Sequence, residues 1–395
     1  MRSAPVRLWH TFGPADTAWL NEELHAVAPD EEIEATLLPF GRAQNRIEGA
    51  LGSHPEPSTD CPDLVRIDAT WLPSLAAGGH LRPIINEAKT LDGLRPEAVE
   101  LVEYNQRHWG LPQAVEPLAL LADHDRVAAA KLPWPPATMD ALLADVHALA
   151  EKDRPGLVLR ADGYDLTALL RAAGADLLDP SSGTPAVDLP SAAAALDQVR
   201  AEIVAGAIAI PPERGDASAG AVRAFVERRA ALLVAGPWTL PEPPPFAVDV
   251  VPWPVASDGR ATAPRGGHVY VVPRCATQPD RAWALETALT APEREAGWAQ
   301  RRGIVPTHVS VPVTAPLGTG FLAALAATRP LPRHPLTPRL FDDLTPAVRA
   351  VLDGEATGAE ALAGVTRAWR RLAGLEPMPS SLPAVDAAPV PGGPR

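Results

Sequence analysis

The sequence predicts an α/β protein in which parallel sheets are covered by helices on both faces. Short apolar stretches alternate along the chain with longer amphipathic ones, which is the order of strands and helices in βαβ units. Of the 395 residues, 46% are hydrophobic and 21% are charged, enough for two domains with sizeable buried cores.

The individual elements follow from the hydrophobic pattern. Apolar stretches predict strands at 6–9, 33–40, 64–67, 156–160, 230–235, 246–251 and 268–273. Amphipathic stretches predict helices at 15–28, 73–77, 138–151, 165–173, 191–205, 219–229, 279–290 and 292–301. Proline-rich runs such as 133–136 and 241–245 are predicted connectors, because proline fixes φ and cannot donate a hydrogen bond. Residues 376–395, rich in Pro, Ala and Gly, are predicted to form a flexible tail.

Charge and hydropathy exclude two classes of protein. The formal net charge is −13 and the pI is about 5.3, whereas binding to nucleic acid or to anionic lipid requires a basic surface. Every apolar run is shorter than the roughly 18 residues that a membrane span needs. The start of the chain has no basic region, apolar segment and cleavage site of a signal peptide, which predicts a cytoplasmic chain or one recorded without its export signal.

The two cysteines, Cys61 and Cys275, leave two alternatives open. They pair in an oxidising compartment, or they remain two inert thiols. We favour the unpaired thiols, because nothing local in the sequence brings the two together.

Motifs of catalysis and of cofactor binding are absent from the sequence. It contains no GxSxG, GxxxxGK[ST], GxGxxG, HExxH or CxxC pattern, so we expect no enzymatic activity, no cofactor and no metal site. Asp123, His124 and Asp125 suggest a metal or acid–base cluster, but we favour a solvated loop after an apolar strand.

Tryptophans stand where a ligand site is expected. The chain has ten tryptophans against three tyrosines and six phenylalanines. Trp71, Trp109, Trp238 and Trp253 follow strands or lie at Gly and Pro turns, and ligands of α/β sheets bind outside the carboxyl ends of strands. An indole there can stack on a sugar ring, although each Trp has the alternative role of filling a core. For Trp19, Trp283 and Trp369, on helical apolar faces, the core role is favoured.

Six segments, taken in order, resemble the extracellular solute-binding proteins of sugar ABC transporters, of the maltose-binding-protein type. LWHTFG is similar to the family's first strand and ligand-facing loop, and WGLPQAVEPLALL to its crossover between lobes. LPWPPATMDALLADVHAL and FVERRAALLVAGPWTL resemble its Pro-rich linker and its Gly-Pro-Trp turn. The segments are 8–13, 62–84, 109–121, 132–149, 225–240 and 291–311.

The resemblance implies a two-lobed periplasmic-binding-protein-like fold. Each lobe is then a mainly parallel sheet flanked by helices, and a hinge joins the lobes. The N-terminal lobe would comprise 1–112 and 257–310, and the C-terminal lobe 113–256 and 311–375.

The resemblance also places ligand-binding residues in the cleft between the lobes. Trp238 falls at the principal stacking position and Glu116 at a hydroxyl-binding carboxylate. Asp162 and Tyr164 match a further acid and aromatic. Asp68, Trp71, His10 and Thr11 would line the cleft from the other lobe, Arg302 would face its mouth, and Trp109 is a further candidate.

The function implied is that of a receptor. It would capture a mono-, di- or oligosaccharide by hinge closure and deliver it to the permease subunits of an ABC transporter. We expect a monomer at the periplasmic or extracellular face of the membrane, with no nucleic-acid partner. The missing signal peptide favours an alternative, a cytoplasmic ligand-sensing module of the same fold, and a two-lobed enzyme is a second alternative.

Overall fold

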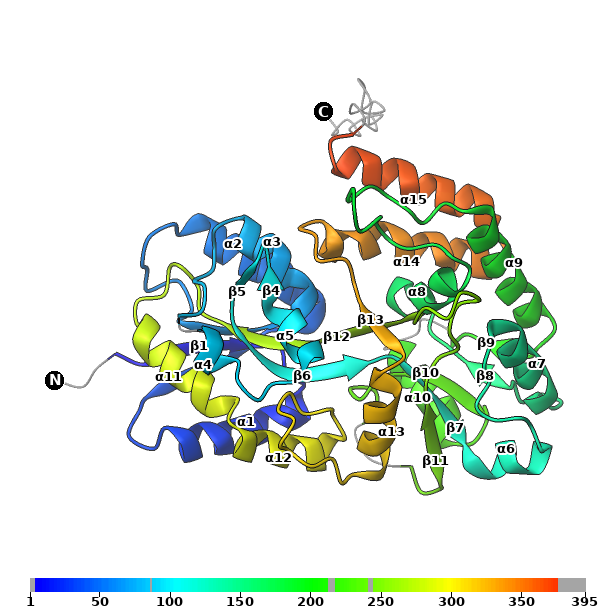
Figure 1. Ribbon diagram of the computed structural model, residues 1–395, viewed down its shortest axis with the longest axis horizontal. Helices are drawn as coiled ribbons and strands as arrows, with labels where there is room; N and C mark the ends of the chain where they lie inside the picture. The colour runs from blue at the N-terminus through cyan, green and yellow to red at the C-terminus, as the bar shows by residue number, and fades with distance from the viewer. Residues whose placement is uncertain (1–3, 86, 212–216, 241–243, 376–395) are drawn as a thin grey trace, which may run out of the picture.

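The computed structural model describes residues 4–85, 87–211, 217–240 and 244–375, which form two α/β lobes lying side by side (Figure 1). We call the lobe that holds the N-terminus the first lobe and the other the second lobe. The two-lobed α/β fold class is therefore confirmed. The expected tail at 376–395 lies outside the described residues.

The first lobe is built on a six-stranded sheet in the order β13-β12-β3-β1-β2, with β6 paired to β12. Its strands are β1 (Val6–His10), β2 (Ile33–Leu37), β3 (Leu64–Asp68), β6 (Leu111–Pro117), β12 (Ala263–Val271) and β13 (Thr328–Pro330). As predicted, β1 runs parallel to β2 and to β3. In contrast, β12 is antiparallel to β3 and β6.

Helices cover both faces of this sheet because successive side chains of a strand point to opposite faces. On β3, Leu64 packs with Leu20, whereas Val65 packs with Ile47 and Leu51 on the other face. The helices are α1 (Pro14–Val27), α2 (Phe40–Ser53), η1 (Ala69–Trp71), α3 (Leu72–Ala77), α4 (Glu87–Thr90), α5 (Pro96–Val102), α11 (Pro279–Leu289) and α12 (Pro292–Arg302). A hairpin of β4 (Glu103–Tyr104) and β5 (Arg107–His108) adjoins them.

The second lobe has a five-stranded sheet in the order β11-β7-β10-β8-β9. Its strands are β7 (Ala119–Asp123), β8 (Leu157–Val158), β9 (Ile208–Ala209), β10 (Leu232–Ala235) and β11 (Val248–Val251). Strand β8 is parallel to β9 and β10, while β7 is antiparallel to β10 and β11. The sheets are thus more mixed than predicted. The reason is that β7 follows β6 directly through Leu118 and enters this sheet without a crossover helix.

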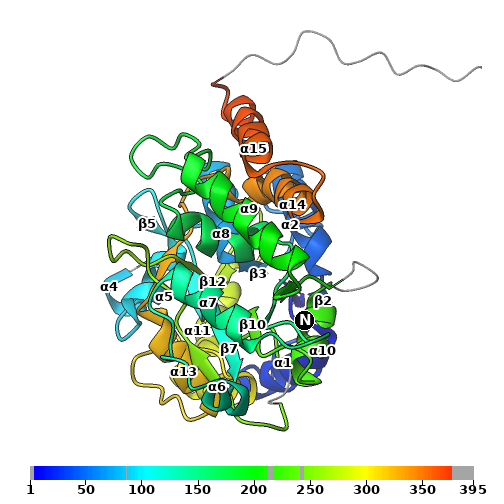
Figure 2. The ribbon, with the colours of Figure 1, turned by 90° about the vertical axis from the view of Figure 1, so that its right-hand side faces the viewer.

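Helices enclose the second sheet, and two late ones form a layer with α9 (Figure 2). They are α6 (His124–Ala130), α7 (Met139–Leu149), α8 (Gly163–Ala172), α9 (Pro190–Val204), α10 (Ala217–Val226), α13 (Pro316–Leu325), α14 (Thr337–Asp353) and α15 (Gly358–Leu372). Trp369 is fully buried in this layer, as predicted for a core residue. Thr357 and Glu360 form a capping box that starts α15. None of the described helices is both long and apolar enough to cross a bilayer.

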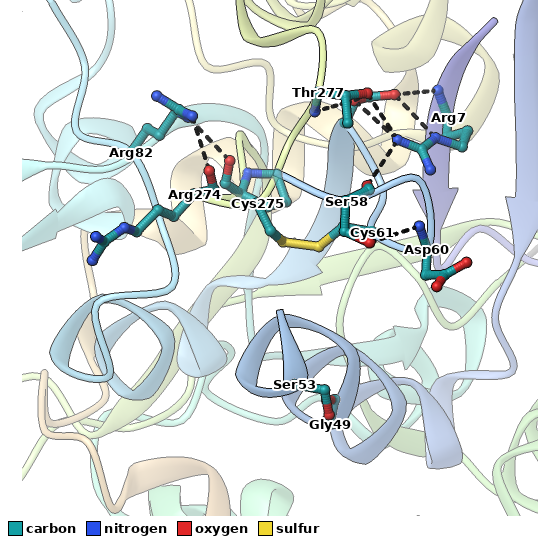
Figure 3. The surroundings of a disulfide bond; sticks show 12 residues. Arg7, Gly49, Ser53, Ser58, Asp60, Cys61, Arg82, Arg274, Cys275 and Thr277 are labelled. Atoms are coloured by element: carbon teal, nitrogen blue, oxygen red, sulfur yellow. Dashed lines mark hydrogen bonds and ion pairs between the residues drawn. A yellow bond between two sulfur atoms is a disulfide. The ribbon is translucent and has the colours of Figure 1, made fainter. Parts of the chain in front are cut away.

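A disulfide joins Cys61, before β3, to Cys275, after β12 (Figure 3). Our preference for unpaired thiols is therefore wrong. The antiparallel pairing of β3 with β12 brings the two loops together. Because the cysteines are far apart in the sequence, this proximity cannot be recognised from local sequence patterns. Nearby, the buried Asp63 carboxylate accepts hydrogen bonds from Arg7, Thr277 and Gln278.

Candidate functional site

A cleft of about 650 Å³ lies between the lobes. Its wall takes residues from the carboxyl ends of strands and from the helices that face them. Eight of the ten sequence-predicted site residues line it: Thr11, Asp68, Trp71, Glu116, Asp162, Tyr164, Trp238 and Arg302. The sequence reasoning missed other wall residues, among them Phe12, Phe40, Arg66, Gln113, His268, Arg339 and Phe341.

The second lobe contributes an aromatic cluster of Tyr164, Trp238 and Phe341. The Tyr164 ring centroid lies 6.0 Å from that of Trp238 and 6.1 Å from that of Phe341. Trp238 follows β10 at a turn where Gly236 is required, because a Cβ there would lie 1.9 Å from the indole ring. This second-lobe aromatic cluster offers half-buried rings to the cleft.

The first lobe contributes an aromatic pair of Phe40 and Trp71, with ring centroids 5.3 Å apart. Phe40 starts α2 and is 52% exposed, whereas Trp71 in η1 is buried. Sequence reasoning missed Phe40 because the predicted strand at 33–40 included it, although β2 ends at Leu37. The cleft thus has aromatic rings on both lobes.

Two of the predicted carboxylates also organise the local backbone. Asp68 Oδ1 accepts hydrogen bonds from the Thr70 N–H at 2.8 Å and hydroxyl at 2.6 Å, and Asp68 caps η1. Asp162 Oδ1 accepts the Tyr164 N–H at 2.8 Å and caps α8. Capping holds each carboxylate in a defined orientation at the cleft wall.

Glu116 pairs with His268 across the β6–β12 ladder. Glu116 Oε2 lies 3.0 Å from His268 Nδ1, and the glutamate side chain is buried. Burial opposes the charge, but the pKa of Glu116 is still lowered, because His268, Arg66 and Arg302 stabilise the carboxylate. Glu116 is therefore ionised at neutral pH.

Four arginines line the cleft, and three of them form ion pairs with carboxylates. Arg160 Nη2 is 2.6 Å from Asp165 Oδ1, Arg302 Nε is 3.5 Å from Asp16 Oδ1, and Arg339 Nη2 is 2.8 Å from Glu48 Oε2. The fourth is Arg66 on β3, which is 5% exposed and bonds to Gln113 and Thr11.

His10 and Trp109 do not line the cleft, contrary to our expectation. His10 is fully buried at the end of β1, where burial and Arg66 lower its pKa to about 4, so the imidazole is neutral. Trp109 lies between the short strand β5 and β6, and its indole N–H donates to the carbonyl of Tyr104 at 3.0 Å. Both side chains therefore make their contacts within the protein and not at the cleft wall.

The segment 123–125 forms ion pairs outside the cleft wall. The buried Asp123 caps α6 and accepts two hydrogen bonds from Arg228, at 2.7 and 2.8 Å. His124 lies 3.0 Å from Asp249, and Asp125 lies 3.1 Å from Arg228. Within the described ranges, no three His, Cys, Asp or Glu side chains group as metal ligands would.

Comparison with known proteins gives a family. The sequence model of the bacterial extracellular solute-binding proteins matches residues 13–296. A curated relative, the maltotriose-binding protein of Pyrococcus abyssi, is 27% identical over 274 residues, which are 67% of this chain and 56% of the relative. The chain thus matches little more than half the length of that relative.

Solved structures share the fold across nearly the whole chain. The GacH receptor of Streptomyces glaucescens, solved unliganded and with acarbose, has 24% identity and a TM-score of 0.80, covering 94% of this chain and 99% of its own. Lmo0181 from Listeria monocytogenes, in complex with cycloalternan, has 14% identity and a TM-score of 0.81, with coverage of 94% and 99%. Maltose-bound MalE3 of T. maritima has 21% identity and a TM-score of 0.80, with coverage of 94% and 100%.

Proposed function

Because the chain belongs to the bacterial extracellular solute-binding proteins, we propose that it is a carbohydrate receptor of an ABC transporter. The observation that carries the proposal is the cleft with aromatic rings on both lobes and oriented carboxylates between them. The family is one of binding proteins, and the action we propose is capture and release of an unchanged ligand.

The chemistry of the wall suits a sugar. The apolar face of a pyranose stacks on the rings of Trp238 and Tyr164, while its hydroxyls donate to Glu116, Asp68 and Asp162. A volume of about 650 Å³ lies in the usual range of small-molecule sites. The maltotriose, acarbose, cycloalternan and maltose in the names of the relatives are all carbohydrates or carbohydrate-like, which supports this class.

Closure of the lobes is the proposed mechanism. A ligand that touches the walls of both lobes binds the closed arrangement better and so shifts the population toward it. We assign 1–112 and 257–310 to the first lobe and 113–256 and 311–375 mainly to the second, except that β6 and β13 add strands to the first sheet. The β6–β7 crossing, which passes through Leu118, would then be part of the hinge.

We place the receptor outside the cytoplasm, where a permease would recognise its closed surface. The Cys61–Cys275 disulfide supports this location, because structural disulfides form and persist in oxidising compartments. The same bond weighs against a cytoplasmic sensing module. We expect the receptor to act as a monomer.

The test is a thermal-shift screen of the purified chain against neutral and acidic mono-, di- and oligosaccharides. A ligand at a hundred times its Kd adds about 2.7 kcal/mol to stability, which raises the Tm by about 2 °C or more. Trp238→Ala should abolish the shift. Trp283→Ala, in α11 outside the cleft wall, is the matched control and should retain it. No shift with any carbohydrate would refute the proposal.

A further inference from the structure

Arg66 is a buried cation in the cleft wall whose side-chain hydrogen-bond partners, Gln113 and Thr11, are both neutral. It lies on β3 between Val65 and Ile67, which face the core on the other side of the sheet. Its side chain therefore points to the face that carries Thr11, Phe12 and Gln113.

Three of the five N–H groups of Arg66 have protein acceptors. Nε and Nη2 donate to Gln113 Oε1 at 3.0 and 2.9 Å, and Nη1 donates to Thr11 Oγ1 at 3.0 Å. The guanidinium carbon lies 3.8 Å from the Phe12 ring centroid. One N–H on each terminal nitrogen remains, and two such donors match the two oxygens of a carboxylate.

The charge of Arg66 is not compensated in the way that buried charges in proteins usually are. Among the described residues, no carboxylate lies within 4 Å of its guanidinium, whereas Arg160, Arg302 and Arg339 each have one. Glu116, Asp16 and Asp68 act on it only from a greater distance. Burial lowers the pKa of Arg66 to about 10, so it still carries its charge at neutral pH.

We propose that the ligand is an acidic carbohydrate, whose anionic group binds to the two remaining N–H groups of Arg66. A neutral hydroxyl there would leave the buried cation without an anion in direct contact, and a carboxylate, sulfate or phosphate supplies one. The inference rests on the proposed function of the cleft as a carbohydrate site. It goes further by stating which class of carbohydrate the site selects.

Titration calorimetry with matched ligands tests the inference on the wild-type chain. The pairs are glucuronate with glucose, galacturonate with galactose, and a uronate-containing disaccharide with its neutral counterpart. Glucose 6-phosphate distinguishes a phosphate from a carboxylate. The acidic member of at least one pair should bind about tenfold or more tightly, since a hydrogen bond to a charged group is worth that factor or more.

A variant locates the effect at Arg66. Arg66→Gln should remove most of the preference for the acidic ligand, measured as the ratio of the affinities for the acidic and the neutral member of each pair. Arg7→Gln, on β1 and outside the cleft wall, is the control for loss of an arginine from the same sheet. If Arg66→Gln does not fold, the wild-type pairs alone decide.

The outcomes separate the two proposals. Neutral sugars that bind as tightly as their acidic partners overturn the acidic ligand and leave the carbohydrate receptor standing. An acidic-to-neutral affinity ratio that is the same in Arg66→Gln and the wild type also overturns it. If no carbohydrate of either kind binds, the receptor function itself fails.

Discussion

Arg339 of α14 and Glu48 of α2 connect the two lobes at the cleft, with Nη2 and Oε2 2.8 Å apart. Glu48 also accepts hydrogen bonds from Gln44 and Ser74, which hold its carboxylate in place within the first lobe. The ion pair forms only when α14 lies near α2, so it stabilises the arrangement in which the lobes approach each other.

Removing this ion pair should speed ligand release. Both side chains are partly exposed, and such pairs contribute about 0–1 kcal/mol. Arg339→Gln is therefore expected to raise the dissociation rate by about two- to fivefold in stopped-flow fluorescence. Glu48→Gln should have no further effect in the double variant, and Arg367→Gln in α15 is the control. An unchanged dissociation rate would show that the pair does not hold the lobes together.

His268 should set the acid limit of carbohydrate binding. It pairs with Glu116, whose lowered pKa keeps the carboxylate charged below the ordinary value of 4.5. Burial raises the pKa of Glu116, and His268 counteracts this by stabilising the carboxylate. In His268→Phe that stabilisation is lost, so the pKa of Glu116 rises. As the solution is acidified, the affinity for carbohydrate is then lost at a higher pH than in the wild type. Calorimetry from pH 4 to pH 8, normalised to the value at pH 8, measures the shift. Superimposable profiles would contradict it.

Glu286 should make stability fall as the pH rises. Its side chain is 2% exposed, Oε1 accepts the Leu111 N–H at 2.8 Å, and burial raises the pKa from 4.5 to about 8. Between these values the folded state holds the proton and the unfolded state does not, so stability falls by up to about 1.4 kcal/mol per pH unit.

Glu286→Gln is the test of this effect, because it keeps an acceptor for Leu111 and cannot ionise. The difference in free energy of unfolding between variant and wild type should grow in favour of the variant from pH 5 to pH 8. Comparing the two chains at each pH cancels the contributions of other buried acids. A difference that is independent of pH would rule out the titration of Glu286.

Loss of the disulfide should destabilise the chain without closing the cleft to ligand. Replacing Cys61 and Cys275 by Ser removes a cross-link that closes a loop of 214 residues, and we expect a loss of about 2–5 kcal/mol in urea unfolding. The reduced wild type should behave like the double variant. Equal stability of the oxidised and reduced wild type would contradict the prediction.

Asp162, Tyr164 and Trp238, which the family resemblance named as ligand-binding residues, line the cleft. Asp162 and Tyr164 stand at the start of one helix, and Trp238 follows a buried strand through a Gly-Pro turn. Trp109 also has Gly and Pro neighbours, but it precedes β6. It therefore lies at the amino end of that strand, whereas Glu116, which lines the cleft, lies near the carboxyl end.

The parts that were missed depend on distant pairing or on an element boundary. In the sequence, Arg66 is one residue of a short apolar strand. Its place in the cleft wall becomes evident only from its hydrogen bond to Gln113, which lies 47 residues later. Phe40 was hidden by a strand predicted three residues too long. The strand directions of β7 and β12 follow from the crossings between lobes, which hydrophobic periodicity does not report.

The strand order of the first sheet also dictates when that sheet can be completed during synthesis. Asp68 pairs with His268, about 200 residues later in the chain. Until β12 emerges, β3 is an apolar edge with open backbone hydrogen bonds, and such edges are prone to pair with other chains. The first part of the second lobe, through β11, is made in this interval, so a nascent or translocating chain carries an unfinished first lobe. We therefore expect production of the chain to depend on protection of β3 by a chaperone, or on slow folding until residue 271 is available.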